Sequence, residues 1–292
     1  MTVESLDVTA ADGHRFRALV FPAVDRSGAM SATTDGPPVL LFMPALGVKA
    51  KWYSRLGEAF AQAGVSFAIF DWRGIDTSSV RASRRVDFGY RHLLEDDLPA
   101  ARAAVRARLP KGKLFVGGHS LGGQFSACHA GAQPDGVDGL VIIAGGNVHW
   151  RGWQGLNALG ILAMTQGTVA ISSVVGHFPG ERLGFGGREA RGVMRDWAAV
   201  ARSGIYRARG SKIDYEKAMA ALARPVLALG FRADGFAPAR STERLMAKLP
   251  RCDRTVWRWS ESETGGAALD HFSWVKRPEL VVPRVADWIK AR

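Results

Sequence analysis

The feature that most limits the fold of this chain is a series of short apolar runs in which hydrophobic residues do not alternate with polar ones. Strands buried on both faces have this pattern, which is typical of parallel sheets. The runs are Val39–Met43, Val65–Phe70 and Leu114–Gly117, and further strands are predicted at Gly139–Ala144, Pro225–Leu229 and Thr255–Trp259. Predicted helices lie among them at Tyr53–Ala63, His92–Leu109, Pro238–Leu249 and Pro278–Ala291. This alternation predicts an α/β fold with a mostly parallel central sheet and helices on both faces.

Three segments fall outside the alternation. Val3–Pro22 alternates apolar and polar residues around Asp12-Gly13, which predicts an antiparallel hairpin. A loop rich in Gly, Ser, Thr and Pro follows at Ser27–Pro38. Residues 147–224 contain no predicted strand and are too long for an ordinary connection. We therefore expect a helical cap at 147–224, inserted into a core domain formed by residues 1–146 and 225–292.

Composition limits the partners of the protein. The 292 residues are 47% hydrophobic and 23% charged, as in an ordinary globular protein. The formal net charge is +12, but the basic residues are scattered and are not interleaved with stacking aromatics, so we expect no nucleic-acid partner. Cys128 and Cys252 stand alone, and no pair of histidines has metal-binding spacing, so neither a disulfide framework nor a metal site is expected. The N-terminal residues do not resemble a signal peptide, which predicts a cytoplasmic protein.

One uncharged stretch, between Arg151 and Glu181, is long enough to cross a bilayer. Several polar residues interrupt it, among them Gln154, Asn157 and Gln166. Broken apolar segments of this kind are more typical of a lid or of a core. We therefore expect no membrane span.

The chemistry of the chain is indicated by a GxSxG sequence, Gly118-His119-Ser120-Leu121-Gly122, directly after a predicted strand and before a helix that starts near Leu121. A serine at such a sharp turn has a strained backbone, and a Cβ at Gly118 or Gly122 would collide with the turn. The alternative is a tightly packed turn or a nucleotide-binding loop, but the glycine patterns of nucleotide sites are absent. Ser120 is therefore the predicted nucleophile.

A serine nucleophile needs a histidine base and an acid that orients it, in the chain order Ser, acid, His for this arrangement. Asp234 follows the strand Pro225–Leu229, and His271 is the only histidine beyond it. We predict Asp234 as the acid and His271 as the base. Alternatively, Asp234 is only a charge at a helix start and His271 a surface histidine; Asp253 and Asp270 are rival acids.

These residues resemble the α/β-hydrolase superfamily over nearly the whole chain, in particular serine hydrolases of the serine aminopeptidase and lipase-like type. Further matches are Pro44-Ala45-Leu46-Gly47 at the oxyanion loop, Asp71-Trp72-Arg73-Gly74 at the DxRG turn, and Asp234-Gly235-Phe236-Ala237-Pro238 at the acid loop. Pro44 replaces the usual histidine, and Asp76 replaces the second glycine of DxRGxG.

The position of these motifs implies that the backbone N–H groups of Leu121 and Leu46 form an oxyanion hole, with Ala45 as the alternative second donor. The resemblance implies a serine hydrolase that cleaves a carboxylic ester or thioester of a small, largely apolar molecule, without a cofactor. An acyltransferase with the same triad, or a catalytically weak ligand-binding protein, remains an alternative. Trp150, Trp153 and Phe178 are expected to bind substrate, unless they form the cap's own core.

Overall fold

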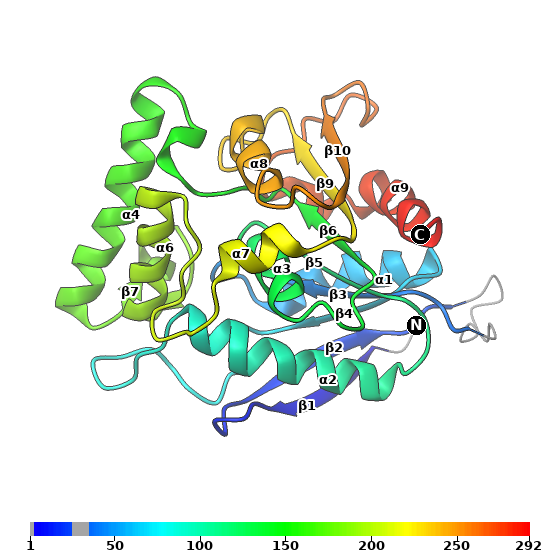
Figure 1. The fold of residues 1–292 in the computed structure, drawn as a ribbon, viewed down its shortest axis with the longest axis horizontal. Helices are drawn as coiled ribbons and strands as arrows, with labels where there is room; N and C mark the ends of the chain where they lie inside the picture. The colour runs from blue at the N-terminus through cyan, green and yellow to red at the C-terminus, as the bar shows by residue number, and fades with distance from the viewer. Residues whose placement is uncertain (1–2, 25–34) are drawn as a thin grey trace.

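The central element of the protein is an eight-stranded sheet in the order β1-β2-β4-β3-β5-β6-β9-β10 (Figure 1). The computed structural model describes residues 3–24 and 35–292, so most of the predicted loop Ser27–Pro38 lies outside the described residues. The strands are β1 (Glu4–Thr9), β2 (Arg15–Phe21), β3 (Val39–Met43), β4 (Ser66–Phe70), β5 (Leu114–His119), β6 (Gly139–Ile143), β9 (Pro225–Phe231) and β10 (Asp253–Trp259). β1 and β2 pair in antiparallel fashion, β2 is antiparallel to β4, and the other pairs are parallel. The predicted α/β class, the hairpin and the six further strands are confirmed.

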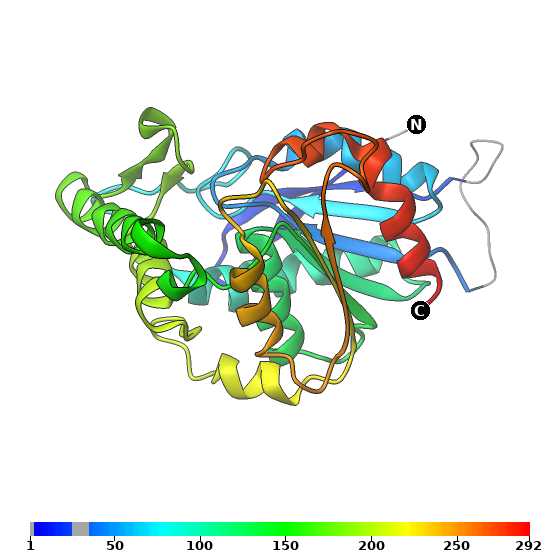
Figure 2. The same cartoon turned by 90° about the horizontal axis from the view of Figure 1, so that it is seen from above.

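Helices cover both faces of the sheet (Figure 2). The helices of the sheet region are α1 (Ser54–Gln62), α2 (Leu98–Arg108), α3 (Leu121–Ala132), α8 (Ala239–Met246) and α9 (Pro278–Lys290). Consecutive strand residues point into opposite layers: Leu41 packs in the cluster beneath α2 and α3, whereas Leu40 and Phe42 pack in the cluster beneath α1 and α9. The inner strands β3, β4, β5, β6 and β9 are thus buried on both sides, which explains their lack of polar alternation, whereas β1, β2 and β10 keep exposed residues.

The helix predicted at His92–Leu109 has an irregular start. Its first turn, His92–Asp97, is π-helical, and the regular α2 begins at Leu98. Such turns are frequent at functional or buried polar positions. Here the π-helical turn carries the fully buried carboxylate of Asp97.

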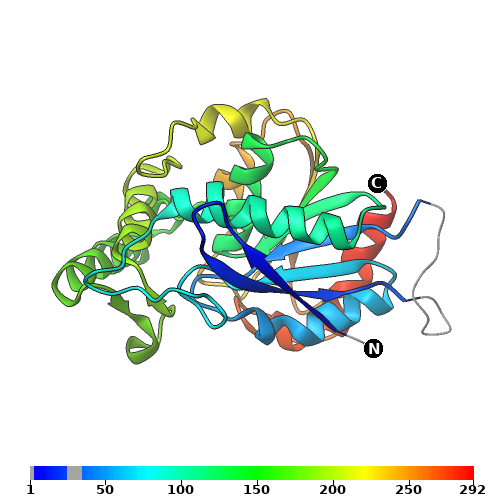
Figure 3. The ribbon, with the colours of Figure 1, turned by 90° about the horizontal axis from the view of Figure 1, so that it is seen from below.

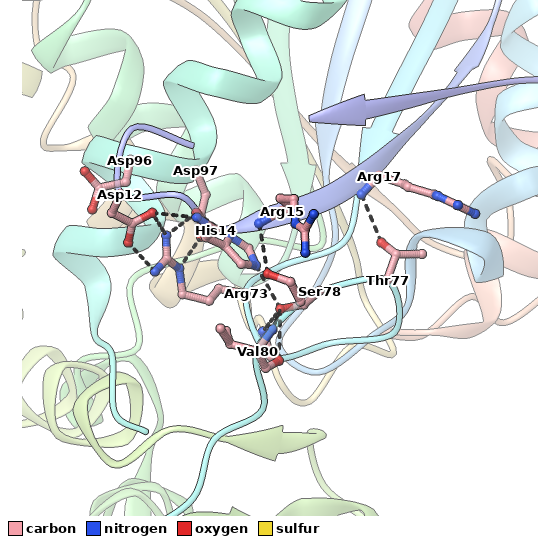
Figure 4. A network of polar contacts seen from close by, with 12 residues as sticks. Asp12, His14, Arg15, Arg17, Arg73, Thr77, Ser78, Val80, Asp96 and Asp97 are labelled. Atoms are coloured by element: carbon pink, nitrogen blue, oxygen red, sulfur yellow. Dashed lines mark hydrogen bonds and ion pairs between the residues drawn. The ribbon is translucent and has the colours of Figure 1, made fainter. Parts of the chain in front are cut away.

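Asp97 belongs to a buried polar network that ties the β1–β2 hairpin, at the edge of the sheet, to the turn after β4 (Figures 3 and 4). Arg73 donates from Nε and Nη2 to Asp97, at 3.0 and 2.6 Å, and from Nη2 to Asp12 at 2.9 Å. His14 lies between Asp97, 2.8 Å from Nδ1, and the Ser78 hydroxyl, 2.8 Å from Nε2. The Asp-x-Arg-Gly turn therefore has a structural task in this chain.

Replacement of Arg73 by methionine is expected to lower the free energy of unfolding by about 3–5 kcal/mol, because it leaves the Asp97 carboxylate buried without its cation.

Hydrogen bonding from Arg73 lowers the pKa of Asp12 to about 2. This contribution to stability is present above the unfolded-state pKa near 3.8 and is lost as the pH falls towards 2. Urea unfolding at neutral and acid pH measures both effects. The exposed Arg17–Asp7 pair gives the control, since Arg17→Met should change stability by less than about 1 kcal/mol; an equal loss in the two variants would contradict the account.

The insertion between β6 and β9 contains α4 (Gly155–Val175), the short helix α5 (Gly180–Leu183), α6 (Arg191–Ser203) and α7 (Tyr215–Ala221). The expectation that no strand lies in residues 147–224 is wrong: β7 (Phe178–Pro179) and β8 (Arg188–Glu189) form a two-residue antiparallel pair. Strands this short have no periodicity to detect. The glycine-rich turn between them is held by the N–H of Gly180, which donates to the carbonyl of Gly187.

The insertion falls into two parts. α4 packs along α6 beyond the carboxyl ends of the strands, whereas α7 packs against α3 on the face of the sheet (Figures 1 and 2). Met219 of α7 lies so close to Gly131 of α3 that a Cβ at Gly131 would meet the Met219 backbone nitrogen at 2.7 Å. We propose that α4, α5 and α6 form the cap and that α7 belongs to the core.

Candidate active site

Ser120 lies at a sharp turn between β5 and α3. Its backbone has φ 54° and ψ −114°, a conformation that non-glycine residues rarely adopt. A Cβ at Gly118 would overlap the backbone of Gly122, and a Cβ at Gly122 would overlap the carbonyl of Met43. The predicted need for glycine on both sides of Ser120 therefore has a direct steric cause. The turn presents the hydroxyl at the carboxyl edge of the sheet.

Three side chains predicted from chain order meet at this edge. Ser120 Oγ lies 3.0 Å from His271 Nε2, and His271 Nδ1 lies 2.9 Å from Asp234 Oδ2. A carboxylate only accepts hydrogen bonds, so Nδ1 carries the proton and Nε2 accepts from the serine hydroxyl. This is the tautomer that a general base requires.

Asp234 is held on the loop after β9. It is buried, and its Oδ1 accepts the backbone N–H groups of Phe236 and Ala237, each at 2.8 Å. The carboxylate thus caps the turn before α8 and orients His271 with the same group. Neither rival acid is near the imidazole nitrogens: Asp253 pairs with Arg292 at 3.8 Å, and Asp270 accepts N–H bonds from the turn after His271.

Ala45 cannot contribute its N–H to an oxyanion without losing a bond, because it donates to the Tyr53 hydroxyl at 3.0 Å. Among the described residues, the N–H groups of Leu46 and Leu121 have no acceptor. Both residues line the cavity that Ser120 faces. Of the two candidates for the second donor, the hydrogen bonding favours Leu46.

Tyr53 is a residue of the site that the sequence did not reveal. Burial raises its pKa far above the ordinary value, so the hydroxyl keeps its proton, and His119 Nδ1 lies 2.9 Å away to receive it. Burial also lowers the pKa of His119 well below its ordinary value. A positive charge on His271, whose ring centroid is 4.9 Å away, lowers this pKa further, so His119 stays neutral. The Tyr53 hydroxyl thus holds two parts of the site in place: the backbone of Ala45 in the oxyanion loop and the ring of His119, which packs against His271.

Tyr53→Phe is expected to lower the free energy of unfolding by about 1–3 kcal/mol, because the Ala45 N–H and His119 each lose a buried partner. Tyr90 provides a matched control. Its hydroxyl is buried without a hydrogen-bond partner among the described residues, so Tyr90→Phe should be neutral or stabilising. Chemical denaturation of the two variants tests this, and equal stability of both would show that the Tyr53 bonds contribute nothing.

The cavity above Ser120 has a volume of about 210 Å³ and is lined mainly by apolar side chains. The insertion contributes Trp153, Ile161, Met164, Phe185 and Trp197, and the loops around the triad contribute Phe236 and Phe272. Besides the reacting groups, the polar side chains are Gln124 and Ser241; the side-chain oxygen Oε1 of Gln124 accepts a hydrogen bond from the Tyr206 hydroxyl at 3.1 Å.

Of the three aromatic residues expected to bind substrate, Trp153 lines this cavity and the other two do not. Phe178 is buried in β7 as part of the hydrophobic core, and Trp150 is half-buried against the same core with Arg151 over its ring. Aromatic composition alone could not separate the inner surface of the cap from its core. Among the described residues, no group of three or more His, Cys, Asp or Glu side chains could hold a metal ion.

Residues 37–260 match the family described as alpha/beta hydrolase fold. The chain belongs to this α/β-hydrolase family. The match covers β3 to β10 of the α/β-hydrolase, including Ser120 and Asp234. No curated protein matches the sequence.

The α/β-hydrolase is similar in structure to several solved proteins. A soluble variant of monoglyceride lipase from Saccharomyces cerevisiae has a TM-score of 0.69 at 15% identity, covering 99% of this chain and 96% of that one. The esterase domain of a Rhodothermus marinus protein has a TM-score of 0.61 at 17% identity, covering 99% and 98%. An esterase from Exiguobacterium antarcticum has a TM-score of 0.64 at 12% identity, covering 98% and 100%. At these identities the likeness extends to the fold.

Proposed function

We propose that the protein is a serine hydrolase that cleaves carboxylic esters of small, largely apolar acyl groups through an acyl-enzyme intermediate. The observation that carries this proposal is the continuous hydrogen-bonded series from Ser120 Oγ through His271 to Asp234, at the floor of an apolar cavity. Packing of a half-buried serine does not require such a series of partners. The series is what makes a hydroxyl nucleophilic at neutral pH.

The first half of the reaction forms the acyl-enzyme. Ser120 Oγ attacks the ester carbonyl carbon as His271 Nε2 takes its proton. The N–H groups of Leu46 and Leu121 bind the oxygen that becomes negative in the tetrahedral intermediate. The intermediate then breaks its bond to the alkoxy oxygen, and His271 returns the proton to the departing alcohol.

The second half releases the acid. A water molecule attacks the acyl carbon while His271 removes its proton, and the bond to Ser120 Oγ breaks as the serine recovers a proton. Asp234 stays ionised throughout and stabilises the imidazolium that forms twice per cycle. Every step uses groups of this chain, so the proposal includes no cofactor.

A panel of p-nitrophenyl esters, an acyl thioester and an acyl p-nitroanilide tests the proposed reaction. We expect turnover of the esters, with kcat/KM highest for an acyl chain that fills the cavity, and little turnover of the anilide. Adding a primary alcohol tests the acyltransferase alternative, because a transferase would form the new ester in preference to the free acid. Saturable ligand binding without turnover of any substrate would leave only the binding-protein alternative.

Trp153→Ala is expected to raise kcat/KM for an octanoate ester relative to an acetate ester by about tenfold, because removing the indole lengthens an apolar pocket. Trp150→Ala is the control: this tryptophan belongs to the same turn but does not line the cavity. Kinetics over acetate, butyrate and octanoate esters measure the preference. Equal changes in the two variants would contradict the position of Trp153 in the acyl pocket.

A further inference from the structure

α4 exposes several large aliphatic side chains, whereas its buried side chains are small or polar. The buried side chains are Ala158, Thr165, Thr168 and Ser172, and the partly buried Ile161 and Met164 also face inward, toward the catalytic cavity. On the outer face, Leu156, Leu159 and Val174 are 84%, 56% and 72% exposed. These three follow the three- and four-residue spacing of one helix face, through Ala163 and Ala170. An amphipathic helix of a water-soluble domain has the opposite arrangement.

The helix is also apolar enough to enter a lipid phase. Its 21 residues carry no charge, and only 22% of its most apolar stretch of 18 residues is buried. α4 is nevertheless tied to the protein along one side, where Gln166 Nε2 donates to the Ala198 carbonyl of α6 at 3.2 Å. A helix held in this way has one face available to a lipid surface. It is arranged to lie on a membrane rather than to cross it.

The segment of the insertion that contains α4 has an excess of positive charge. Residues 147–213 contain nine Lys or Arg residues against three acids, and two of these acids, Glu189 and Asp196, are buried. The exposed arginines include Arg151 just before α4 and Arg182 on α5, close to the exposed acid Glu181. Basic residues beside an exposed apolar helix complement anionic lipid headgroups.

The active site opens beside the same helix. A second cavity, of about 480 Å³, lies between the first half of α4 and the loops that carry Asp234 and His271. It shares lining residues with the catalytic cavity, namely Trp153, Ile161, Met164, Phe236, His271 and Phe272. Phe236 and Phe272 are partly exposed there. The apolar rim of the entrance and the outer face of α4 thus share the Trp153–Met164 segment.

We propose that the outer face of α4 docks on the surface of an anionic phospholipid bilayer, and that acyl substrates enter the active site from the lipid through the second cavity. Leu156, Leu159 and Val174 insert below the headgroups, and Arg151 and Arg182 contact the phosphates. The docking follows from the exposed apolar face and the surrounding charge. The entry of substrate also rests on the proposed function.

Co-sedimentation with phosphatidylglycerol/phosphatidylcholine vesicles tests the docking, with the Ser120→Ala protein used throughout so that the lipids stay intact. We expect binding that weakens as salt is raised and that is much weaker on pure phosphatidylcholine. The triple variant Leu156→Ser, Leu159→Ser, Val174→Ser keeps the net charge and should bind at least tenfold more weakly. Val256→Ser, at an exposed position of β10, is the matched control and should bind like the parent.

A charge variant, Arg151→Gln with Arg182→Gln, should lose affinity for the anionic vesicles and show a weaker dependence on salt. Equal binding of the parent and the triple variant, binding that does not distinguish anionic from neutral vesicles, or no binding at all would overturn the proposal. A dimer that is lost in the triple variant, without vesicle binding, would instead assign this face to a second copy of the chain. Circular dichroism of each variant verifies that it is folded.

The two proposals fail separately. With catalytic Ser120 restored, the triple variant should hydrolyse a soluble acetate ester at the parental rate, but lose at least tenfold in activity on an ester embedded in anionic vesicles. Vesicle binding without any esterase activity would contradict the proposed function and the proposed entry of substrate, but would support the docking. Esterase activity on both substrates in the absence of vesicle binding would contradict the proposed docking, but would support the proposed function.

Discussion

Replacement of Ser120 by alanine is expected to reduce ester hydrolysis to the uncatalysed background without unfolding the protein. In the serine protease where this was measured, removal of the nucleophile lowers kcat by about 10⁶-fold. The cause here is the loss of the only hydroxyl within hydrogen-bond distance of His271 Nε2 among the described residues. Steady-state rates on a p-nitrophenyl butyrate substrate measure the loss.

The control for this variant is Ser126→Ala in the same helix. The Ser126 hydroxyl is buried and donates to the Gly123 carbonyl at 2.8 Å, away from the imidazole. We expect this variant to keep near-parental kcat. If Ser120→Ala retained more than a small percentage of the parental rate, the hydroxyl would not be the attacking group.

Loss of the base and loss of the acid are expected to have different consequences. His271→Ala removes the proton acceptor, so activity should be absent at every pH tested. Asp234→Asn leaves the imidazole in place, but the amide can donate to Nδ1 and so favours the wrong tautomer. The same Asp→Asn change in the triad of a serine protease lowers kcat by about 10⁴-fold.

Asp270→Asn is the control for the acid, because Asp270 is adjacent to His271 in sequence and its carboxylate accepts backbone N–H groups of the following turn. It should change kcat by less than tenfold. Full pH–rate profiles of the three variants and the parent measure these differences. If Asp270→Asn lost its activity while Asp234→Asn kept it, Asp270 would be the acid and our assignment of Asp234 would be wrong.

The strands and the three reacting residues could be predicted because each leaves a local mark on the sequence. Burial on both faces makes a run such as Val39–Met43 continuously apolar, and a Cβ at Gly118 or Gly122 would collide with neighbouring backbone. With Asp234 as the acid, chain order leaves His271 as the one candidate base; the place of Asp234 after the strand Pro225–Leu229 favoured it over its rivals, and the structure brings the two residues together.

Tyr53 illustrates what could not be predicted. Its spacing marks it only as a buried residue of a helix, and its partners Ala45 and His119 are 8 and 66 positions away. Long-range contacts of single side chains have no periodicity. The same applies to the insertion, where Trp153 and Phe178 are both buried aromatics, but only the three-dimensional structure shows that Trp153 lines the cavity and Phe178 does not.

The central claim is that Ser120 forms a covalent intermediate, and phosphonate labelling tests it most directly. The parent protein is incubated with an alkyl p-nitrophenyl phosphonate, and its intact mass, its residual esterase activity and its peptide map are measured together. We predict one adduct per chain, located on Ser120, and a loss of activity in proportion to labelling. An adduct at another residue, or full activity in a completely labelled protein, would contradict the account.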